Sequence, residues 1–190
     1  MNRRVSGKVA ILGHSYITRL AQAISQNDKF NHEFGLEGVE VKLWGRPGGR
    51  IMDVDRLIDE MKHSGYRPHV TIIQIGGNDL DDPSFEISRF LGVLQYLVSR
   101  LEAWGVQRIV IMKLFPRIRL RRVSSIIYNQ RRVQVNLALA RTYRGHVSFE
   151  SRKRLLNPHL LSDGVHLGRV GMRRYYHELK WLMVKKLRSL

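Results

Sequence analysis

The segment Val9–Ser15, with the sequence VAILGHS, is the strongest indication of the architecture of this chain of 190 residues. Its apolar run Val9–Leu12 lacks the alternation of a half-exposed strand, so it predicts a strand buried on both faces, as in a parallel sheet. Gly13 would allow a sharp turn after this strand, and Ser15 would follow directly before a helix over Tyr16–Ser25. Open α/β sheets bind ligands at this carboxyl end of their strands. Ser15 therefore has two interpretations, a helix cap or a reactive residue.

Strand and helix patterns alternate along the rest of the chain. Further strands are predicted at Val39–Trp44, His69–Ile75, Val106–Met112 and Val147–Phe149. Further helices are predicted at Ile51–Ser64, from the Asp82-Pro83 pair to Gly105, at Ile126–Tyr143 and at Gly168–Leu190. This pattern predicts the α/β class and a flavodoxin-like three-layer α/β/α sandwich, with a five-stranded parallel sheet in the order 2-1-3-4-5. Because no linker or repeat interrupts it, we expect a single domain over residues 1–190.

Positive charge is concentrated in the second half of the chain. Residues 1–105 contain 13 Lys and Arg against 13 Asp and Glu, whereas residues 106–190 contain 20 against 3 and carry the whole net charge of +17. A basic field of this size attracts polyanions, nucleic acid before acidic membranes; the alternative is a solvated basic surface without a partner. The candidate nucleic-acid contacts are Arg117, Arg119, Arg121, Arg122, Arg131, Arg132, Arg152, Lys153, Arg154, Arg173 and Arg174.

Several classes of protein are excluded by what the sequence lacks. There is no cysteine, and therefore no disulfide, thiolate metal site or cysteine nucleophile. No apolar run approaches the roughly 18 residues of a membrane helix, and Met1–Lys8 is polar and followed by only four apolar residues, so no signal peptide is predicted. We expect an intracellular protein, cytoplasmic or nuclear, whose last helix packs on the sheet rather than on a membrane through Tyr175, Leu179, Leu182 and Met183.

No metal or cofactor is predicted either. The sequence contains no phosphate-binding Gly-x-x-x-x-Gly-Lys motif and no Gly-x-Gly-x-x-Gly motif after a strand. Three nearby carboxylates, Asp79, Asp81 and Asp82, have two interpretations: they could bind a metal ion, as in a nuclease, or form a turn and a helix cap. We expect the turn and cap.

Four short motifs are predicted to meet at one edge of the sheet. They are Gly13-His14-Ser15-Tyr16, Pro47-Gly48-Gly49-Arg50, Gly76-Gly77-Asn78-Asp79 and Asp163-Gly164-Val165-His166-Leu167. Each alone is ordinary turn or loop sequence. The first three follow the first three strands, whose carboxyl ends share an edge in a parallel sheet, and the fourth lies in the loop that returns to that edge before the last helix.

Together these motifs contain the groups that acyl transfer requires. His166 can take the proton of the Ser15 hydroxyl, and Asp163 can orient the imidazole and stabilise its charged form. A tetrahedral intermediate also needs hydrogen-bond donors for its oxyanion. The backbone N–H groups of Ser15 and Gly49 and the side-chain amide of Asn78 are candidate donors. The predicted edge therefore offers a candidate for every role in such a site.

The four motifs, in this order, resemble those of the SGNH (GDSL-type) serine hydrolases, and the resemblance covers nearly the whole chain. It implies Ser15 as nucleophile, with Asp163 and His166 completing a catalytic triad. It also implies that Gly49 and Asn78 complete the oxyanion hole. Gly49 is chosen over its neighbour because the glycine of the family usually comes last before the residues that start the helix.

One residue departs from the family pattern, which usually has Asp directly before the serine where this chain has His14. A histidine there could compete for the serine proton or bring a positive charge, so it bears on the level of activity.

The closer likeness is to SGNH-type domains encoded by retrotransposons. It rests on the His-Ser pair, on Lys113–Arg117 and on Tyr128–Val133 followed by Val135-Asn136. Because such proteins accompany the RNA of their element, this likeness fits the basic half of the chain.

Two functions are therefore expected. The first is a metal-independent serine esterase that hydrolyses short-chain acyl esters, in particular acetyl esters, and that also associates with nucleic acid. The alternative is a catalytically weak or inactive module of the same fold whose basic half binds RNA or DNA. Ester hydrolysis that depends on Ser15 distinguishes the esterase from the binding module. An affinity for RNA or DNA that falls steeply as the salt concentration rises supports nucleic-acid binding.

Overall fold

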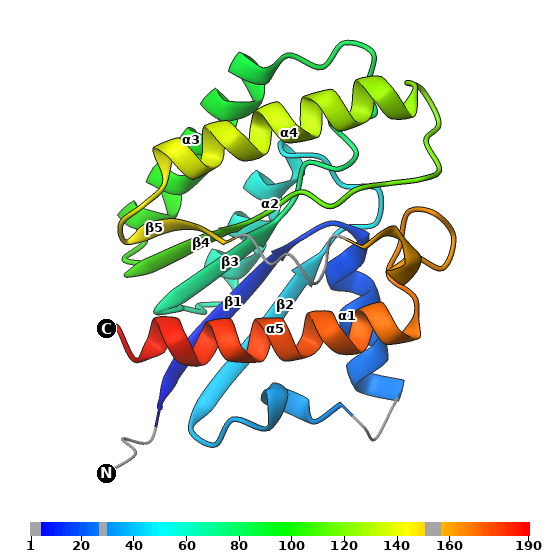
Figure 1. Ribbon diagram of the computed structural model, residues 1–190. Helices are drawn as coiled ribbons and strands as arrows, with labels where there is room; N and C mark the ends of the chain where they lie inside the picture. The colour runs from blue at the N-terminus through cyan, green and yellow to red at the C-terminus, as the bar shows by residue number, and fades with distance from the viewer. Residues whose placement is uncertain (1–4, 27–29, 151–156) are drawn as a thin grey trace.

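The computed structural model describes residues 5–26, 30–150 and 157–190. Its strands form one sheet in the order β2-β1-β3-β4-β5, and every neighbouring pair is parallel (Figure 1). The strands are β1 (Gly7–Gly13), β2 (Val39–Gly45), β3 (Val70–Gln74), β4 (Arg108–Met112) and β5 (Val147–Glu150). The predicted α/β class and strand order are confirmed.

Helices cover both faces of the sheet and make the predicted three-layer sandwich (Figure 1). The helices are α1 (Ser15–Gln26), α2 (Asp53–His63), α3 (Ile87–Ala103), α4 (Ser125–Thr142) and α5 (Arg169–Leu187), with the short 3-10 helices η1 (His32–Gly35) and η3 (Pro158–Leu160). Helices α1 and α5 pack on one face, and α2, α3 and α4 pack on the other. No helix in the described part of the chain is both long enough and apolar enough to cross a membrane.

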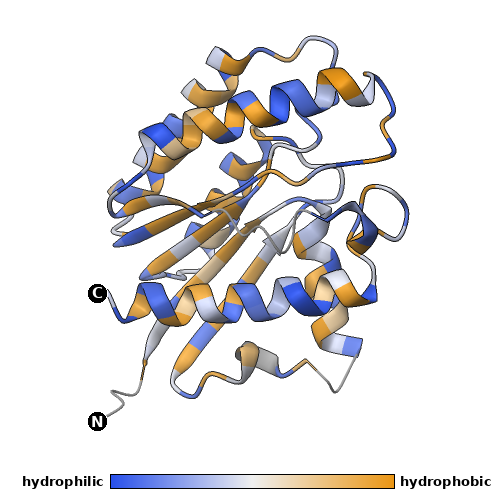
Figure 2. Ribbon diagram, in the orientation of Figure 1, coloured by the Kyte–Doolittle hydropathy of each residue, from blue (hydrophilic) through white to orange (hydrophobic). Residues whose placement is uncertain are grey.

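The run of apolar residues in β1 is explained by this double cover. Val9 and Ile11 belong to the core beneath α1 and α5, whereas Ala10 and Leu12 belong to the core beneath α2, α3 and α4. Successive side chains of a strand point to opposite faces, so a strand covered on both sides needs apolar residues at every position. Figure 2 shows the same contrast, with largely hydrophobic central strands and polar residues alternating along α5.

Glycines at the ends of β1 and β2 allow two close approaches, of β1 to the end of β3 and of α1 to the end of β2. A Cβ on Gly13 would lie 2.3 Å from the carbonyl oxygen of Gln74, and one on Gly45 would lie 2.6 Å from the backbone nitrogen of Thr18. Gly13 does not have a positive φ angle, so the predicted turn is not the reason for glycine here. The reason is close packing of backbone on backbone, which fixes the position of Ser15.

The start of the third helix was predicted wrongly. Helix α3 begins at Ile87, not at Asp82-Pro83. The Asp82 carboxylate accepts hydrogen bonds from the backbone N–H and the hydroxyl of Ser84, at 2.9 and 2.8 Å, and it pairs with Arg50. Because the turn and the ion pair occupy this carboxylate, it is not available to cap a helix. At the C-terminus, by contrast, the apolar face predicted for the last helix is buried against the sheet.

Candidate active site

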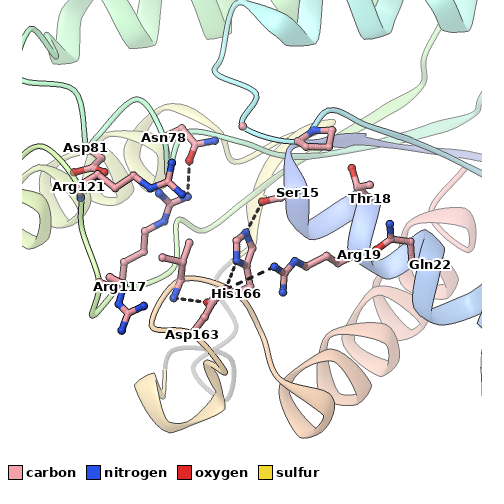
Figure 3. A pocket seen from close by; sticks show the side chains of 14 residues that line it. Ser15, Thr18, Arg19, Gln22, Asn78, Asp81, Arg117, Arg121, Asp163 and His166 are labelled. Atoms are coloured by element: carbon pink, nitrogen blue, oxygen red, sulfur yellow. Dashed lines mark hydrogen bonds and ion pairs between the residues drawn. The ribbon is translucent and has the colours of Figure 1, made fainter.

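A pocket of about 510 Å³ lies at the carboxyl edge of the sheet, beside the loop between η3 and α5 (Figure 3). It is lined by Ser15, Thr18, Arg19, Gln22, Pro47, Gly48, Asn78, Asp81, Arg117, Arg119, Arg121, Asp163, Val165 and His166. Ser15 is the first residue of α1, and Gly48 and Asn78 follow β2 and β3. Asp163 and His166 come from the loop before α5. All four predicted motifs therefore meet at the predicted edge.

Ser15, His166 and Asp163 form a continuous chain of hydrogen bonds (Figure 3). The Ser15 hydroxyl oxygen lies 2.9 Å from Nε2 of His166, and Nδ1 of the same ring lies 2.7 Å from Oδ2 of Asp163. The other carboxylate oxygen accepts the backbone N–H groups of Val165 and His166, at 2.9 and 2.6 Å. This arrangement favours the tautomer with the proton on Nδ1, which leaves Nε2 as an acceptor for the serine proton.

Asp163 is held in its charged form. Burial acts to raise its pKa, but the hydrogen bonds from His166 and Val165 outweigh burial and hold the pKa of this carboxyl well below its usual range. The Arg19 guanidinium lies 3.6 Å from the same carboxylate. Asp163 is therefore ionised at neutral pH, as a residue that stabilises an imidazolium must be.

The loop that carries His166 is fixed on two sides. On one side, the hydroxyl of Tyr16 in α1 donates to the carbonyl oxygen of Val165. On the other, the carbonyl oxygen of Gly164 accepts the N–H groups of Ile118 and Arg119, at 2.7 and 3.1 Å. Gly164 has a φ angle of +79°, and a Cβ there would lie 2.9 Å from Cβ of Arg119. The glycine between the aspartate and the histidine is thus required by conformation and by space.

Asn78 is clamped at the rim of the pocket. Its side-chain nitrogen donates to the carbonyl oxygen of Gly49 at 2.8 Å, and its side-chain oxygen accepts from Nη2 of Arg117 at 3.0 Å. These two contacts fix which end of the amide is the donor. Arg117 reaches Asn78 because Gly77 has no side chain: a Cβ there would lie 2.5 Å from Nη2 of Arg117.

Arg117 is a residue of the site that the sequence interpretation misplaced. It was predicted to contact nucleic acid, but it is only 7% exposed, and its guanidinium bonds Asn78. The ring centroid of Tyr128 lies 5.9 Å from its guanidinium carbon. Its position after the fourth strand, at the same sheet edge as the other motifs, was a signal available in the sequence.

The choice of Gly49 as a donor to the oxyanion needs correction. The N–H of Gly49 donates to the carbonyl oxygen of Arg46 at 3.0 Å, closing a turn in which Gly48 has a φ angle of +69°. Gly48, and not Gly49, lines the pocket. The role of Gly49 is to accept the hydrogen bond that orients Asn78, and Gly48 is the better candidate for the backbone donor.

Ser15 does not cap α1, so the first of its two interpretations is wrong. Its hydroxyl contacts two histidine nitrogens, Nε2 of His166 and, at 3.4 Å, Nδ1 of His14. The residue before the helix is His14. Its carbonyl oxygen accepts the N–H of Ile17 at 2.9 Å, and its Nδ1 accepts the N–H of Tyr16 at 3.4 Å.

His14 brings no positive charge to the site. The residue is 1% exposed. Burial lowers the pKa of His14 to about 3, and the charges of Arg117 and His166 act in the same direction. The ring is therefore neutral at physiological pH. Of the two alternatives for His14 in the first motif, the positive charge is therefore excluded. The other alternative was competition for the serine proton: Nδ1 of His14 lies 3.4 Å from the Ser15 hydroxyl, farther than the 2.9 Å of Nε2 of His166.

The buried His14 should make stability pH-dependent. Its pKa falls from 6.5 to about 3 on folding. Between these values the unfolded chain binds a proton that the native state does not, so the free energy of unfolding falls as the pH decreases. At pH 4.5, two pH units below the pKa of the unfolded chain, the loss is about 3 kcal/mol. Urea unfolding at pH 7.5 and 4.5 should show a smaller pH effect for His14→Asn than for wild type, whereas the exposed His159→Asn keeps the wild-type difference. An equal pH effect in both variants would contradict this assignment.

The carboxylates after β3 hold backbone segments in place. Asp79 accepts the N–H of Ile51 with both oxygens, at 3.1 and 3.2 Å, and burial raises the pKa of Asp79 to about 6. Asp81 accepts three successive backbone N–H groups, from Arg121, Arg122 and Val123, at 3.1, 3.2 and 3.3 Å. Among the residues that the structure describes, no group of three or more His, Asp or Glu side chains is placed to hold a metal ion.

The other predicted nucleic-acid contacts fall into three groups. Arg131 is half-buried and donates to the carbonyl oxygens of Leu80, Asp82 and Pro83, and the half-buried Arg132 donates to Asn129; both serve the fold. The exposed members are Arg119, Arg121, Arg122, Arg173 and Arg174. Arg152, Lys153 and Arg154 lie outside the described residues.

The comparisons with known proteins concern the fold. No protein-family model and no curated protein matches this sequence. Solved structures do match: a GDSL-like lipase from Bacteroides thetaiotaomicron has a TM-score of 0.69 at 15% identity, over 94% of this chain and 88% of that one. A lipase/acylhydrolase from Enterococcus faecalis has a TM-score of 0.62 at 18% identity, over 96% and 95%. A catalytic mutant of an acetylxylan esterase from Geobacillus stearothermophilus has a TM-score of 0.62 at 15% identity, over 98% and 96%. The fold is thus that of esterases and acylhydrolases.

Proposed function

We propose that this protein is a serine esterase of the SGNH (GDSL) type. One observation carries the proposal: the hydrogen-bonded chain Ser15–His166–Asp163, with 2.9 and 2.7 Å between its partners, opens into a pocket at the carboxyl edge of the sheet. The shared fold with esterases and acylhydrolases supports it. Hydrolysis of an aryl acetate by the wild type, and its loss in Ser15→Ala, test it.

The reaction would proceed in two halves. Ser15 Oγ attacks the ester carbonyl carbon while Nε2 of His166 takes its proton, and Asp163 stabilises the resulting imidazolium. The tetrahedral intermediate collapses as His166 returns this proton to the departing alcohol, which leaves an acyl-enzyme. Water then enters, gives a proton to His166 and attacks the acyl carbon. Collapse of the second intermediate restores Ser15 and releases the acid.

Three donors would stabilise the oxyanion. The N–H of Ser15 belongs to the first turn of α1, whose N–H groups have no partner within the helix and whose dipole favours negative charge. The second donor is the N–H of Gly48, and the third is the amide of Asn78, which Gly49 and Arg117 hold in one orientation. Such preorganised donors act on charge that develops only during the reaction.

We infer a short acyl group from the side chains of the pocket. Of its lining side chains only Pro47 and Val165 are aliphatic, and the others are arginines, carboxylates, hydroxyls, amides and the imidazole of His166. Apart from the alkyl stems of the arginines, such a lining offers few apolar side chains to a long hydrocarbon chain, in which each buried CH₂ group would contribute about 0.8 kcal/mol. We therefore propose acetyl esters as the substrate class.

A second proposal is association with nucleic acid through exposed arginines beside the site, which would suit a protein encoded by a retrotransposon. Arg119, Arg121 and Arg122 lie on the connection from β4 to α4, and Arg173 and Arg174 lie near the start of α5; both segments border the edge that holds the pocket (Figure 1).

Fluorescence anisotropy of a labelled RNA tests this proposal. The affinity of the protein for the RNA should fall at least about 100-fold from 50 to 200 mM salt. Arg173→Gln with Arg174→Gln should weaken binding, and the exposed Arg56→Gln on α2 should not. Affinity that is independent of salt would refute the proposal.

A further inference from the structure

The candidate pocket carries an excess of positive charge. Four arginines line it, Arg19, Arg117, Arg119 and Arg121, against two carboxylates, Asp81 and Asp163, so four positive charges minus two negative charges leave a net charge of +2. Figure 3 shows Arg117 and Arg121 on the Asn78 side of the Ser15–His166 pair and Arg19 on the other side. A site for neutral esters alone has no need of this charge.

The ion pairs and hydrogen bonds of these groups show which arginines carry the excess positive charge. Arg19 is paired with Asp163 at 3.6 Å. The carboxylate of Asp81 is occupied by three backbone N–H groups. Arg119 and Arg121 form no side-chain ion pair with any residue that the structure describes, and both are exposed at the pocket. Their guanidinium groups are therefore available to a ligand.

Arg117 strengthens the positive field. It is 7% exposed, yet its hydrogen-bond partner is the neutral amide of Asn78, and within the described ranges it has no carboxylate partner. Burying a cation without a counter-charge is costly. A negative group in the pocket would offset that cost, and guanidinium groups bind phosphate and carboxylate oxygens in a geometry that lysine does not reproduce.

Room for such a group exists next to the reacting centre. A second cavity of about 200 Å³ shares Gly48, Asn78, Asp81 and Arg121 with the pocket and extends it toward Arg122. The arginine-lined surface therefore continues outward from the candidate oxyanion donors. The remainder of a bound ester could extend in the same direction.

We propose that the natural substrate is an ester that carries an anionic oxygen group, phosphate or carboxylate, which Arg119 and Arg121 bind while Ser15 attacks the acyl carbon. This inference rests on the proposed esterase function and specifies its substrate class. The chemistry is unchanged: the acyl group passes to Ser15 and then to water, and the alcohol leaves with the proton from His166.

Three aryl acetates with equal intrinsic reactivity test this proposal. They are methyl 3-(4-acetoxyphenyl)propionate, which is neutral, the corresponding free propionate, and 2-(4-acetoxyphenyl)ethyl phosphate. Because the charge is remote from the phenol oxygen, differences in kcat/KM report binding rather than leaving-group chemistry. We expect kcat/KM for at least one anionic ester to exceed that of the neutral ester by about 10-fold or more at low salt, and the preference to shrink as salt screens the charges. The two anionic probes separate phosphate from carboxylate recognition.

The arginines are tested by substitution. In the double variant Arg119→Gln, Arg121→Gln, the ratio of kcat/KM for the anionic and neutral esters should fall toward one, mainly through KM for the anionic ester. Arg56→Gln, which removes an exposed arginine that does not line the pocket, should keep the wild-type ratio. An equal loss for both esters in the double variant would overturn the proposal, because it would mean that the arginines serve folding or catalysis instead.

The kinetic outcomes distinguish failure of the proposed esterase function from failure of the proposed anionic substrate. If wild type hydrolyses none of the three esters in a manner that depends on Ser15, the proposed esterase function fails. If it hydrolyses all three through Ser15 with the same kcat/KM, the esterase function stands and the anionic substrate is refuted. A Ser15-dependent preference for the anionic esters that Arg119→Gln and Arg121→Gln remove supports both.

Discussion

Replacing Ser15 with alanine is expected to lower kcat for an aryl acetate by roughly 10⁴-fold or more, since loss of the nucleophile from a triad leaves only the contributions of binding and the oxyanion hole. The hydroxyl lies 2.9 Å from His166 Nε2, and in the proposed mechanism it would carry the covalent step. His166→Ala should have an effect of the same order, because it removes the base from the same unit. Steady-state release of the phenol, followed by absorbance, measures both variants.

The matched control for this substitution is Ser25→Ala. Ser25 belongs to the same helix as Ser15, but its hydroxyl donates to the carbonyl oxygen of Gln22 near the other end of α1. The control should keep wild-type turnover, and circular dichroism should show that all three variants are folded. Undiminished turnover in Ser15→Ala would exclude the proposed mechanism.

Asn78→Ala should lower kcat by about 10²- to 10³-fold, the usual effect of removing one donor to an oxyanion, equivalent to roughly 3–4 kcal/mol. The amide is held by Gly49 and Arg117 before any substrate binds, so its contribution needs no reorganisation during the reaction. KM should change less than kcat, since the donor acts on charge that develops in the transition state.

A double-mutant cycle then shows whether Arg117 acts through Asn78. Arg117→Met should lower kcat in the wild type, because the amide loses the contact at 3.0 Å that orients it. In the Asn78→Ala background the same substitution should have little further effect, since residues that act as a unit are not additive. Independent, multiplicative losses would show that Arg117 acts on the reaction directly. Thermal unfolding of each variant separates loss of orientation from loss of folding.

Local sequence was sufficient to predict the architecture. Val9–Leu12 is apolar at every position because β1 is covered on both faces, and such a run needs no knowledge of its neighbours to be recognised. Once the alternation of strands and helices implied a parallel sheet, its geometry placed the segments after β1, β2 and β3 at one edge. The meeting of Ser15, Asn78 and His166 followed from that rule and from their motifs.

Hydrogen bonds and close contacts that form only in the folded chain decided the details that were predicted wrongly. Asp82 has the chemistry of a helix cap, but Ser84 and Arg50 occupy its carboxylate. Gly48 and Gly49 are indistinguishable in sequence, and only the turn that uses the N–H of Gly49 separates them. Arginine is typical of an exposed surface, and Arg117 was predicted there. It lies in the site because Gly77, which has no side chain, leaves room for its guanidinium group.

Residue order was enough to predict the sheet, the edge that holds the site and the groups that could carry acyl transfer, because periodicity and motif order are local properties of a chain. The electrostatics of that site, in contrast, became visible only in the folded molecule. Folding makes His14 neutral by burying it and keeps Asp163 charged through hydrogen bonds. Among the residues that the structure describes, it gives Arg119 and Arg121, beside the pocket, no ion-pair partner. Protonation and charge pairing depend on burial and on neighbours brought together by folding, and residue order alone specifies neither.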